Sequence, residues 1–280
     1  MVDSYYGIGE GHLVCQDYAL HGSLDDMEYV IISDGCSGAE HSEVGAQILC
    51  HAAKYHIISC YQNDLLKQCS SEFLVKVLGN AILKRVDEIR KIYPINKTAL
   101  EATLLIAIRI GLKLYLFIWG DGIIIENIQI NESRIIKVIN IDYENKPFYL
   151  VSDKNQYMKK WGMRYYKEQN LWGIKNKNSD IIIKDKEMSY LLPFYEPYIY
   201  EKDLKENDNS ITLCSDGILS FKDENKNLVD LLTIVNEFIT FKTIVNGFVK
   251  KRMFFMRRKI KNKNWSYYDD ISTGTIIYEL

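Results

Sequence analysis

Three apolar runs of this chain each end in an aspartate followed by a glycine, and this recurrence limits how the chain can fold. The runs are IISDG at 31–35, IWGDG at 118–122 and TLCSDG at 212–217. Aspartate is a poor strand residue, so its arrival directly after an apolar run needs a reason. Turn formation is one reason, and it is sufficient for any single run, because aspartate accepts backbone hydrogen bonds and glycine adopts positive φ. Three runs, with Asp269-Asp270 ahead of the last apolar segment, favour carboxylates gathered at several strand ends.

Such a group of carboxylates has a chemical consequence. Carboxylates at neighbouring strand ends repel one another unless cations neutralise them. Hard oxygen ligands of this kind suit Mg²⁺ or Mn²⁺ better than Zn²⁺. A pair of these cations about 4 Å apart activates a water and binds phosphoryl oxygens, so the protein itself needs no nucleophile. The pattern therefore predicts a site for divalent metal ions.

The remaining pattern alternates strands and helices, which we assign to one domain over residues 1–280. Apolar residues recur at helical spacing over 39–60 and 72–92, and Pro94 blocks continuation of the second helix. We expect strands at 11–20, 27–33, 123–130, 211–214 and 271–280, a pair of strands within 100–119, and helices at 225–239 and 241–257.

Two segments are harder to interpret. Residues 140–207 are rich in Tyr, Lys and Asn, and only 180–185 predicts a strand, so we expect loops and a flap or insertion. Residues 249–265 concentrate eight basic residues around two phenylalanines. We interpret the latter segment as an amphipathic helix with its aromatic face on the core and its lysines in water. Contact with an acidic partner or an anionic surface is the less favoured interpretation.

Six segments, in order along nearly the whole chain, resemble the motifs of the metal-dependent type 2C (PPM) serine/threonine protein phosphatases. They are GHLVCQDYAL, SDGCSGAEHSEVGA, EATLLIAI, WGDGIIIE, SDG at 215–217 and DDIS at 269–272. Each motif is short, and the shared order makes the resemblance specific. It implies an α/β fold of the α-β-β-α sandwich type, with two mainly antiparallel sheets packed face to face and helices outside.

The resemblance also implies an activity and a site. Members of this family are phosphoprotein phosphatases that hydrolyse phosphoserine and phosphothreonine by direct attack of a metal-activated water. Asp34, Asp216 and Asp17 are the catalytic residues that the resemblance implies. Matched position by position, Asp34, the Gly35 carbonyl, Asp216 and Asp269 hold two Mn²⁺ or Mg²⁺ ions, Asp17 is oriented toward their water shell, and Asp121 belongs to an additional metal position.

Three positions depart from the better-studied members. His12 stands where a phosphate-binding arginine is common, so it is our candidate phosphate-binding residue. Packing or the capping of a turn is an equally good interpretation of His12. Cys36 stands where many eukaryotic members carry a histidine, and we interpret it as a small buried thiol because no phosphate-binding loop ending in arginine follows it. Asp270 lies beside the last ligand, and the family pattern alone selects Asp269.

Composition limits the partners that we expect. The formal charge of −2 gives no attraction of the whole molecule toward nucleic acid or acidic membranes, so we expect neither as a partner. The six cysteines show no zinc-binding spacing, and the first residues do not resemble a secretory signal, which favours the cytoplasm. We expect a phosphorylated protein substrate and a cognate kinase. The alternative function is a catalytically weak or inactive binding or sensor module, which missing ligand aspartates would indicate.

Overall fold

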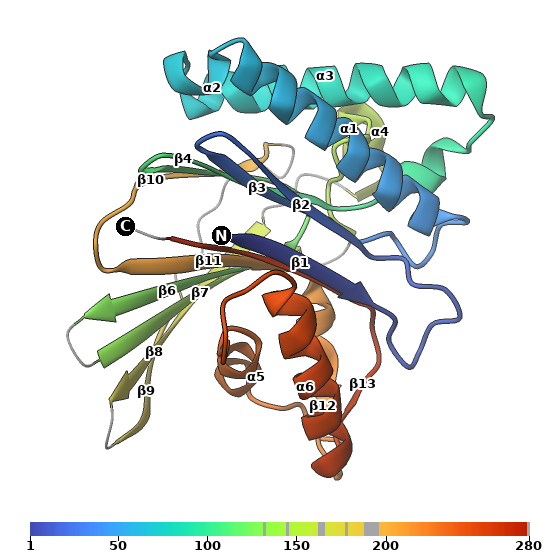
Figure 1. The fold of residues 1–280 in the computed structure, drawn as a ribbon. Coiled ribbons are helices and arrows are strands. Elements are labelled where there is room, and N and C mark those ends of the chain that lie inside the picture. The colour runs from blue at the N-terminus through green and yellow to red at the C-terminus, as the bar shows by residue number, and fades with distance from the viewer. Residues whose placement is uncertain (131–132, 144–145, 162–165, 177–178, 188–195, 279–280) are drawn as a thin grey trace.

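The computed structural model describes residues 1–130, 133–143, 146–161, 166–176, 179–187 and 196–278. Two antiparallel sheets pack face to face and carry helices on their outer sides (Figure 1). This four-layer arrangement confirms the α-β-β-α sandwich predicted from the sequence.

The smaller sheet has five strands in the order β10-β5-β4-β3-β2. Its strands are β2 (Tyr18–Leu24), β3 (Met27–Ser33), β4 (Leu104–Ile110), β5 (Lys113–Trp119) and β10 (Tyr198–Asp203). In β3, Met27, Tyr29 and Ile31 face the helices, while Val30 and Ile32 face the other sheet. A strand that is buried on both faces needs apolar residues at successive positions, which explains the unbroken apolar run in the sequence.

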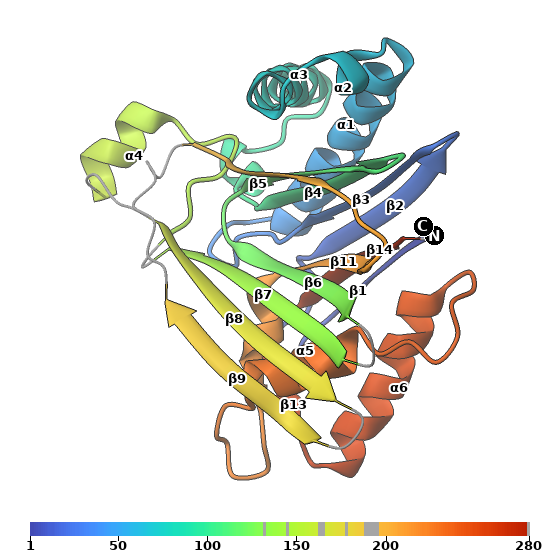
Figure 2. The same cartoon turned by 90° about the vertical axis from the view of Figure 1, so that its left-hand side faces the viewer.

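The larger sheet has seven strands in the order β1-β14-β11-β6-β7-β8-β9. Its strands are β1 (Val2–Gly7), β6 (Gly122–Ile130), β7 (Ser133–Tyr143), β8 (Tyr166–Asn176), β9 (Ser179–Glu187), β11 (Asp208–Cys214) and β14 (Ile271–Ile277). Figure 2 shows β8 and β9 continuing this sheet beyond β7.

Helices cover the outer face of each sheet. The five-stranded sheet is covered by α1 (Ser42–Gln62), α2 (Leu65–Gln68) and α3 (Ser71–Ile92), and the seven-stranded sheet by α5 (Leu231–Phe238) and α6 (Phe248–Asn262). The shorter elements are α4 (Lys154–Trp161), η1 (Lys97–Leu100), η2 (Asp216–Ser220), β12 (Phe221–Lys222) and β13 (Ser266–Tyr267). No helix among the described residues has the length and apolar character to cross a membrane.

The expected strand at 11–20 is wrong over most of its length. Only its end belongs to β2, while residues 8–17 form an irregular loop and an additional strand, β1, precedes it. The loop is held by a distant side chain, because the Asp270 carboxylate accepts hydrogen bonds from the backbone N–H groups of Gly9 and Gln16 at 2.8 and 2.6 Å. The local sequence of residues 8–17 cannot indicate this contact, because its partner lies more than 250 positions away in the chain.

The expectation of mainly irregular loops over 140–207 is also wrong. The segment contributes the end of β7, α4, the paired strands β8 and β9, and the edge strand β10. The strand expected at 180–185 lies within β9 and is confirmed. The others were missed because strands at or near a sheet edge pair through the backbone and need no apolar run. The expected flap stays a prediction, and residues 188–195 of this segment lie outside the described residues.

Helix α6 corrects the expectation that the aromatic side chains of the basic segment face the core. Its buried face carries Met253 and Met256, whereas Phe254 and Phe255 are 55% and 48% exposed. The two methionines fill the helix–sheet contact, so the phenylalanines lie on the side that faces solvent.

Candidate active site

A cavity of about 150 Å³ opens at one end of the two sheets. Strand ends from both sheets meet there, because β3 and β5 end at this side, β11 ends at it, and β6 and β14 start from it. The lining residues are Gln16, Asp34, Gly35, Cys36, Ser37, Thr103, Asp121, Pro147, Tyr149, Asp216 and Asp269. Thus five of the seven sequence-predicted site residues lie at one cavity, and Asp17 and His12 lie outside its lining.

Asp34 is held by Thr103, the residue directly before β4. Its backbone N–H donates to Thr103 Oγ1 at 2.9 Å, and its carbonyl accepts from the Thr103 N–H at 2.8 Å. The next residue must be a glycine, because a Cβ atom at Gly35 would lie 2.8 Å from the Ser42 carbonyl oxygen and 2.9 Å from that of Gln16. Thr103 therefore fixes the backbone of Asp34, and Gly35 allows the backbones at Gln16 and Ser42 to approach it closely.

Asp121 lies in the turn from β5 to β6, between two glycines. Gly120 and Gly122 have φ angles of 93° and 149°, a region that side chains other than glycine rarely adopt. The turn passes the chain from the five-stranded sheet to the seven-stranded sheet. Asp121 consequently lies at the junction of the two sheets and lines the cavity from there.

Asp17 lies beneath the cavity in a buried hydrogen-bond network. Its carboxylate accepts from Ser215 Oγ at 2.7 Å, and Ser215 Oγ accepts from the Ser272 N–H at 2.9 Å. Asp17 is 2% exposed, and this burial raises its pKa to about 7 against the opposing hydrogen bond from Ser215. The network ties the N-terminal loop to the strand ends that precede Asp216 and follow Asp270.

The cavity has an acidic lining that destabilises the charged form of its own carboxylates. Burial raises the pKa of Asp34, Asp121 and Asp269, and the negative charge of Asp216 raises all three further. Asp17 and Asp121 add to the negative charge around Asp34 and raise its pKa in the same direction. Cations in the cavity would relieve this repulsion.

The residues present fit a hard divalent cation by their chemistry. Every candidate ligand offers oxygen, which is the donor that Mg²⁺ and Mn²⁺ prefer. Asp216 Oδ1 is buried without a hydrogen-bond partner, so one acceptor remains for such an ion. Within the described residues, no three His, Cys, Asp or Glu side chains surround a single point closely enough to hold a metal ion.

The adjacent aspartates 269 and 270 face different surroundings. Asp269 lines the cavity, whereas Asp270 is 2% exposed and accepts backbone hydrogen bonds from the N-terminal loop. His12 Nδ1 lies 2.9 Å from Asp270 Oδ2, and His12 Nε2 lies 3.7 Å from Asp269 Oδ1. Burial lowers the pKa of His12, but the hydrogen bond to Asp270 and the nearby carboxylates outweigh it, so the net shift is upward. The phosphate-binding role of His12 stays a prediction.

Sequence reasoning missed Ser37, Pro147 and Tyr149 among the lining residues. Tyr149 is buried. Burial and the nearby Cys36 and Asp121 raise the pKa of Tyr149. Tyr149 and Pro147 come from an irregular stretch after β7, where no local pattern marks a residue that packs against a distant loop.

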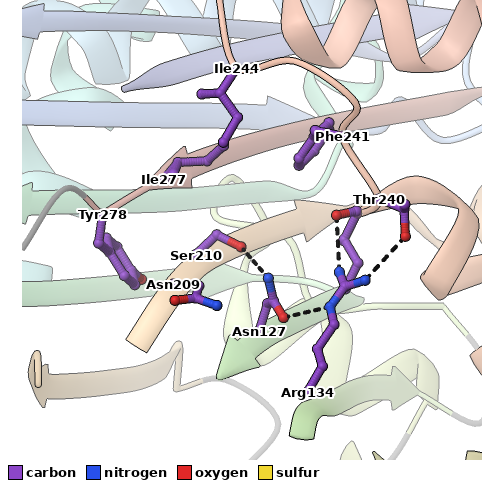
Figure 3. Close-up of a pocket in the computed structure, with 10 residues that line it drawn as sticks. Asn127, Arg134, Asn209, Ser210, Thr240, Phe241, Ile244, Ile277 and Tyr278 are labelled. Atoms are coloured by element: carbon purple, nitrogen blue, oxygen red, sulfur yellow. Dashed lines mark hydrogen bonds between the residues drawn. The ribbon is translucent and has the colours of Figure 1, made fainter. Parts of the chain in front are cut away.

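A second cavity, of about 360 Å³, lies between the seven-stranded sheet and the segment after α5 (Figure 3). Arg134 of β7 donates there to Asn127 Oδ1 at 2.8 Å, Thr240 Oγ1 at 3.1 Å and the Ile239 carbonyl at 3.0 Å. The guanidinium thus joins the sheet to this segment. No carboxylate lines this cavity among the described residues, so the chemistry predicted from the sequence belongs to the smaller, acidic one.

Comparisons with known proteins agree with this arrangement. No curated protein sequence matches the chain. The structure is similar to a serine-threonine phosphatase 2C from Toxoplasma gondii (12% identity, 99% of this chain and 94% of that one, TM-score 0.57). It is also similar to a serine/threonine phosphatase from Staphylococcus aureus (12% identity, 100% and 95%, TM-score 0.55) and to a bacterial serine phosphatase (12% identity, 99% and 97%, TM-score 0.54).

At these identities the structural neighbours show a shared fold. The sequence itself matches the model of the family described as protein phosphatase 2C over residues 9–242. Asp34, Asp121 and Asp216 lie within the match, and Asp269 follows it. Because the match covers most of the chain, this protein belongs to the protein phosphatase 2C family.

Proposed function

We propose that this chain is a metal-dependent phosphatase that hydrolyses phosphoserine and phosphothreonine in proteins. The observation that carries the proposal is the gathering of four aspartates, Asp34, Asp121, Asp216 and Asp269, around one small cavity. Their mutual repulsion, seen in the raised pKa of three of them, gives the cavity a strong preference for cations. Family membership supports the same reaction.

In this proposal the cations are held by Asp34, the Gly35 carbonyl, Asp216 and Asp269, with Asp121 at an additional position. When bound, divalent cations supply Lewis-acid stabilisation of phosphoryl charge and lower the pKa of a nucleophilic water. The chain holds the carboxylates of the site in place. Thr103 fixes Asp34 through two backbone contacts, and the Ser215 hydroxyl fixes Asp17 beneath the site.

The chain also supplies groups that handle the substrate. Gln16, Ser37 and Tyr149 line the cavity with neutral hydrogen-bonding groups suited to phosphoryl oxygens. Asp17, whose pKa is raised by burial, orients its neighbours through Ser215. A phosphorylated protein is the proposed substrate, and a protein kinase that acts on the same substrate is the proposed counterpart.

The test uses protein stripped of metal with a chelator and assayed on an aryl phosphate and a phosphothreonine peptide. We expect activity only after Mn²⁺ or Mg²⁺ is added. Asp216→Asn should lower kcat by about 10³-fold or more, because the site loses a carboxylate that holds the cations. The matched control is Glu224→Gln, which removes an exposed carboxylate eight positions away and should leave activity unchanged.

One observation favours a second candidate, a weakly active or inactive binding module. Among the described residues that line the cavity there is no cationic side chain, since His12 turns its Nδ1 to Asp270. Calorimetric titration with Mn²⁺ separates the two candidates. If Mn²⁺ binds to the wild type and not to Asp216→Asn, and neither substrate turns over, the binding module replaces the phosphatase.

A further inference from the structure

The outer face of α6, which consists of Lys251, Phe254, Phe255, Arg258 and Lys261, is exposed over its whole length. Residues three or four apart on a helix are neighbours, so Lys251 and Arg258 each flank both phenylalanines. The opposite face carries Val249, Met253, Met256 and Ile260 against the core. The helix is therefore apolar on both sides, and only one side is covered.

The loop before α6 lies beside this exposed face. Its Ile244 and Val245 are 46% and 47% exposed, and Ile244 also lines the cavity of Figure 3. Lys242 Nζ lies 5.3 Å from the centre of the Phe255 ring, which places the loop beside the outer face of α6. Figures 1 and 2 show α6 in the outermost layer of the molecule, beyond the seven-stranded sheet. The loop thus adds the positive charge of Lys242 to the outer face of α6.

The charge of this region differs from that of the rest of the chain. Residues 238–268 contain nine Lys and Arg residues and no Asp or Glu, whereas the remainder has 26 basic and 37 acidic residues. Arg252 and Lys259 pair with Glu237. In the part of the chain that the structure describes, Lys251, Arg258 and Lys261 form no ion pair with a carboxylate. Their charge is available to an external anion.

We propose that the outer face of α6 binds the surface of an anionic lipid bilayer. Basic side chains beside a membrane are attracted to anionic headgroups, while adjacent aromatic side chains enter the apolar boundary below them. Long basic side chains reach outward along such a face and keep their charge at the headgroups. An acidic soluble partner accounts for the cations but not for two adjacent exposed phenylalanines on an outer helix.

This inference does not depend on the phosphatase activity. It departs from the sequence-based expectation of no membrane partner, which rested on the charge of the whole chain. The net charge of −2 hides a segment, residues 238–268, that has nine basic and no acidic residues. Headgroups respond to the local charge, because at physiological salt a charge is screened within about 8 Å.

The test is sedimentation of the full chain with vesicles of phosphatidylcholine alone or with 30% phosphatidylserine. We expect binding to the anionic vesicles only, and weaker binding as salt is raised. Lys251→Gln combined with Arg258→Gln should weaken binding about 25-fold, roughly fivefold for each charge removed. Phe254→Ser combined with Phe255→Ser should weaken it by about tenfold or more.

The matched control lies on α3, where Phe73 is 52% exposed and Lys76 is exposed one turn away. Phe73→Ser combined with Lys76→Gln should leave vesicle binding unchanged. Thermal unfolding of every variant checks that each is folded. Two results would overturn the proposal: no binding to anionic vesicles at low salt, or binding that neither α6 variant weakens. Binding to soluble polyglutamate without vesicle binding would instead assign the surface to an acidic protein.

Discussion

Asp269 and Asp270 show how two adjacent carboxylates take different roles. Asp270 is enclosed by the N-terminal loop, where it accepts the N–H groups of Gly9 and Gln16 and pairs with His12. Asp269 is turned to the cavity, and its Oδ1 accepts a hydrogen bond from the N–H of Asp270. We therefore assign stability to Asp270 and cation binding to Asp269.

This assignment predicts opposite effects of two alanine variants. Asp270→Ala leaves two backbone N–H groups without their acceptor and should lower the free energy of unfolding by about 2–4 kcal/mol. Asp269→Ala removes a carboxylate that repels its neighbours, so stability should change by less than about 1 kcal/mol. Its Mn²⁺ affinity should fall instead, by about tenfold or more.

Urea unfolding and calorimetric Mn²⁺ titration measure the two effects separately. Each variant serves as the control for the other, since the substitutions are adjacent and chemically the same. If Asp269→Ala keeps full Mn²⁺ affinity while a stable Asp270→Ala loses it, the two roles must be exchanged.

At the scale of the element, two helix glycines differ in what surrounds them. Gly45 in α1 lies against η1, and a Cβ atom there would come within 1.7 Å of the Ala99 carbonyl oxygen. Gly79 in α3 has more room, because its nearest contacts would be side-chain atoms of Leu150 and Trp119 at 3.4 Å. Only the first glycine is required by a close approach of backbones.

Alanine substitutions at Gly45 and Gly79 should therefore change the stability of the fold in opposite directions. Gly45→Ala forces α1 away from η1 and should destabilise the fold by about 1–3 kcal/mol. Gly79→Ala gains helix propensity without a clash and should be neutral or stabilising by up to about 1 kcal/mol. Urea unfolding of both variants measures the difference. Equal effects at the two positions would show that helix propensity, rather than the contact with η1, decides the outcome.

At the scale of the molecule, a buried ion cluster joins the two sheets. Glu126 of β6 is 4% exposed and accepts hydrogen bonds from Tyr200 at 2.8 Å and Lys202 at 2.9 Å, both in β10 of the other sheet. Lys137 of β7 lies 3.3 Å away. Burial raises the pKa of Glu126, but Lys137 and Lys202 outweigh it and leave the pKa below its usual value.

A lowered pKa in the folded state makes stability depend on pH. The carboxylate stabilises the fold above its unfolded pKa of about 4.3, and this contribution is lost as pH falls through the lower folded value. Glu126→Gln should lower the free energy of unfolding by about 2 kcal/mol at pH 7. This is less than the loss expected when a buried ion pair is broken, because Lys202 keeps Asp208 as a partner. The difference from wild type should persist to about pH 5 and vanish toward pH 3.

Urea unfolding at pH 7, 5 and 3 measures this difference, with the exposed Glu224→Gln as the variant that should match wild type throughout. A difference for Glu126→Gln that stays constant down to pH 3 would mean that packing, rather than charge, is responsible.

The sequence by itself determined the elements that local pattern controls. Strands buried on both faces require unbroken apolar runs, as in β3, β5 and β11, and the Asp-Gly turns mark where such strands end. These turns and the other motifs, in their order, carry the family resemblance that implied the sandwich and named Asp34, Asp121, Asp216 and Asp269, which the structure brings to one cavity.

Only the tertiary structure decided which faces and partners these elements have. Helix spacing predicted α1, but its apolar Val44 is exposed while Gly45 is buried, where it lies against η1. The same holds for the exposed phenylalanines of α6, the paired strands β8 and β9, and Asp270 at the N-terminal loop. Local pattern specifies period and polarity, whereas these features depend on contacts between residues far apart in the chain.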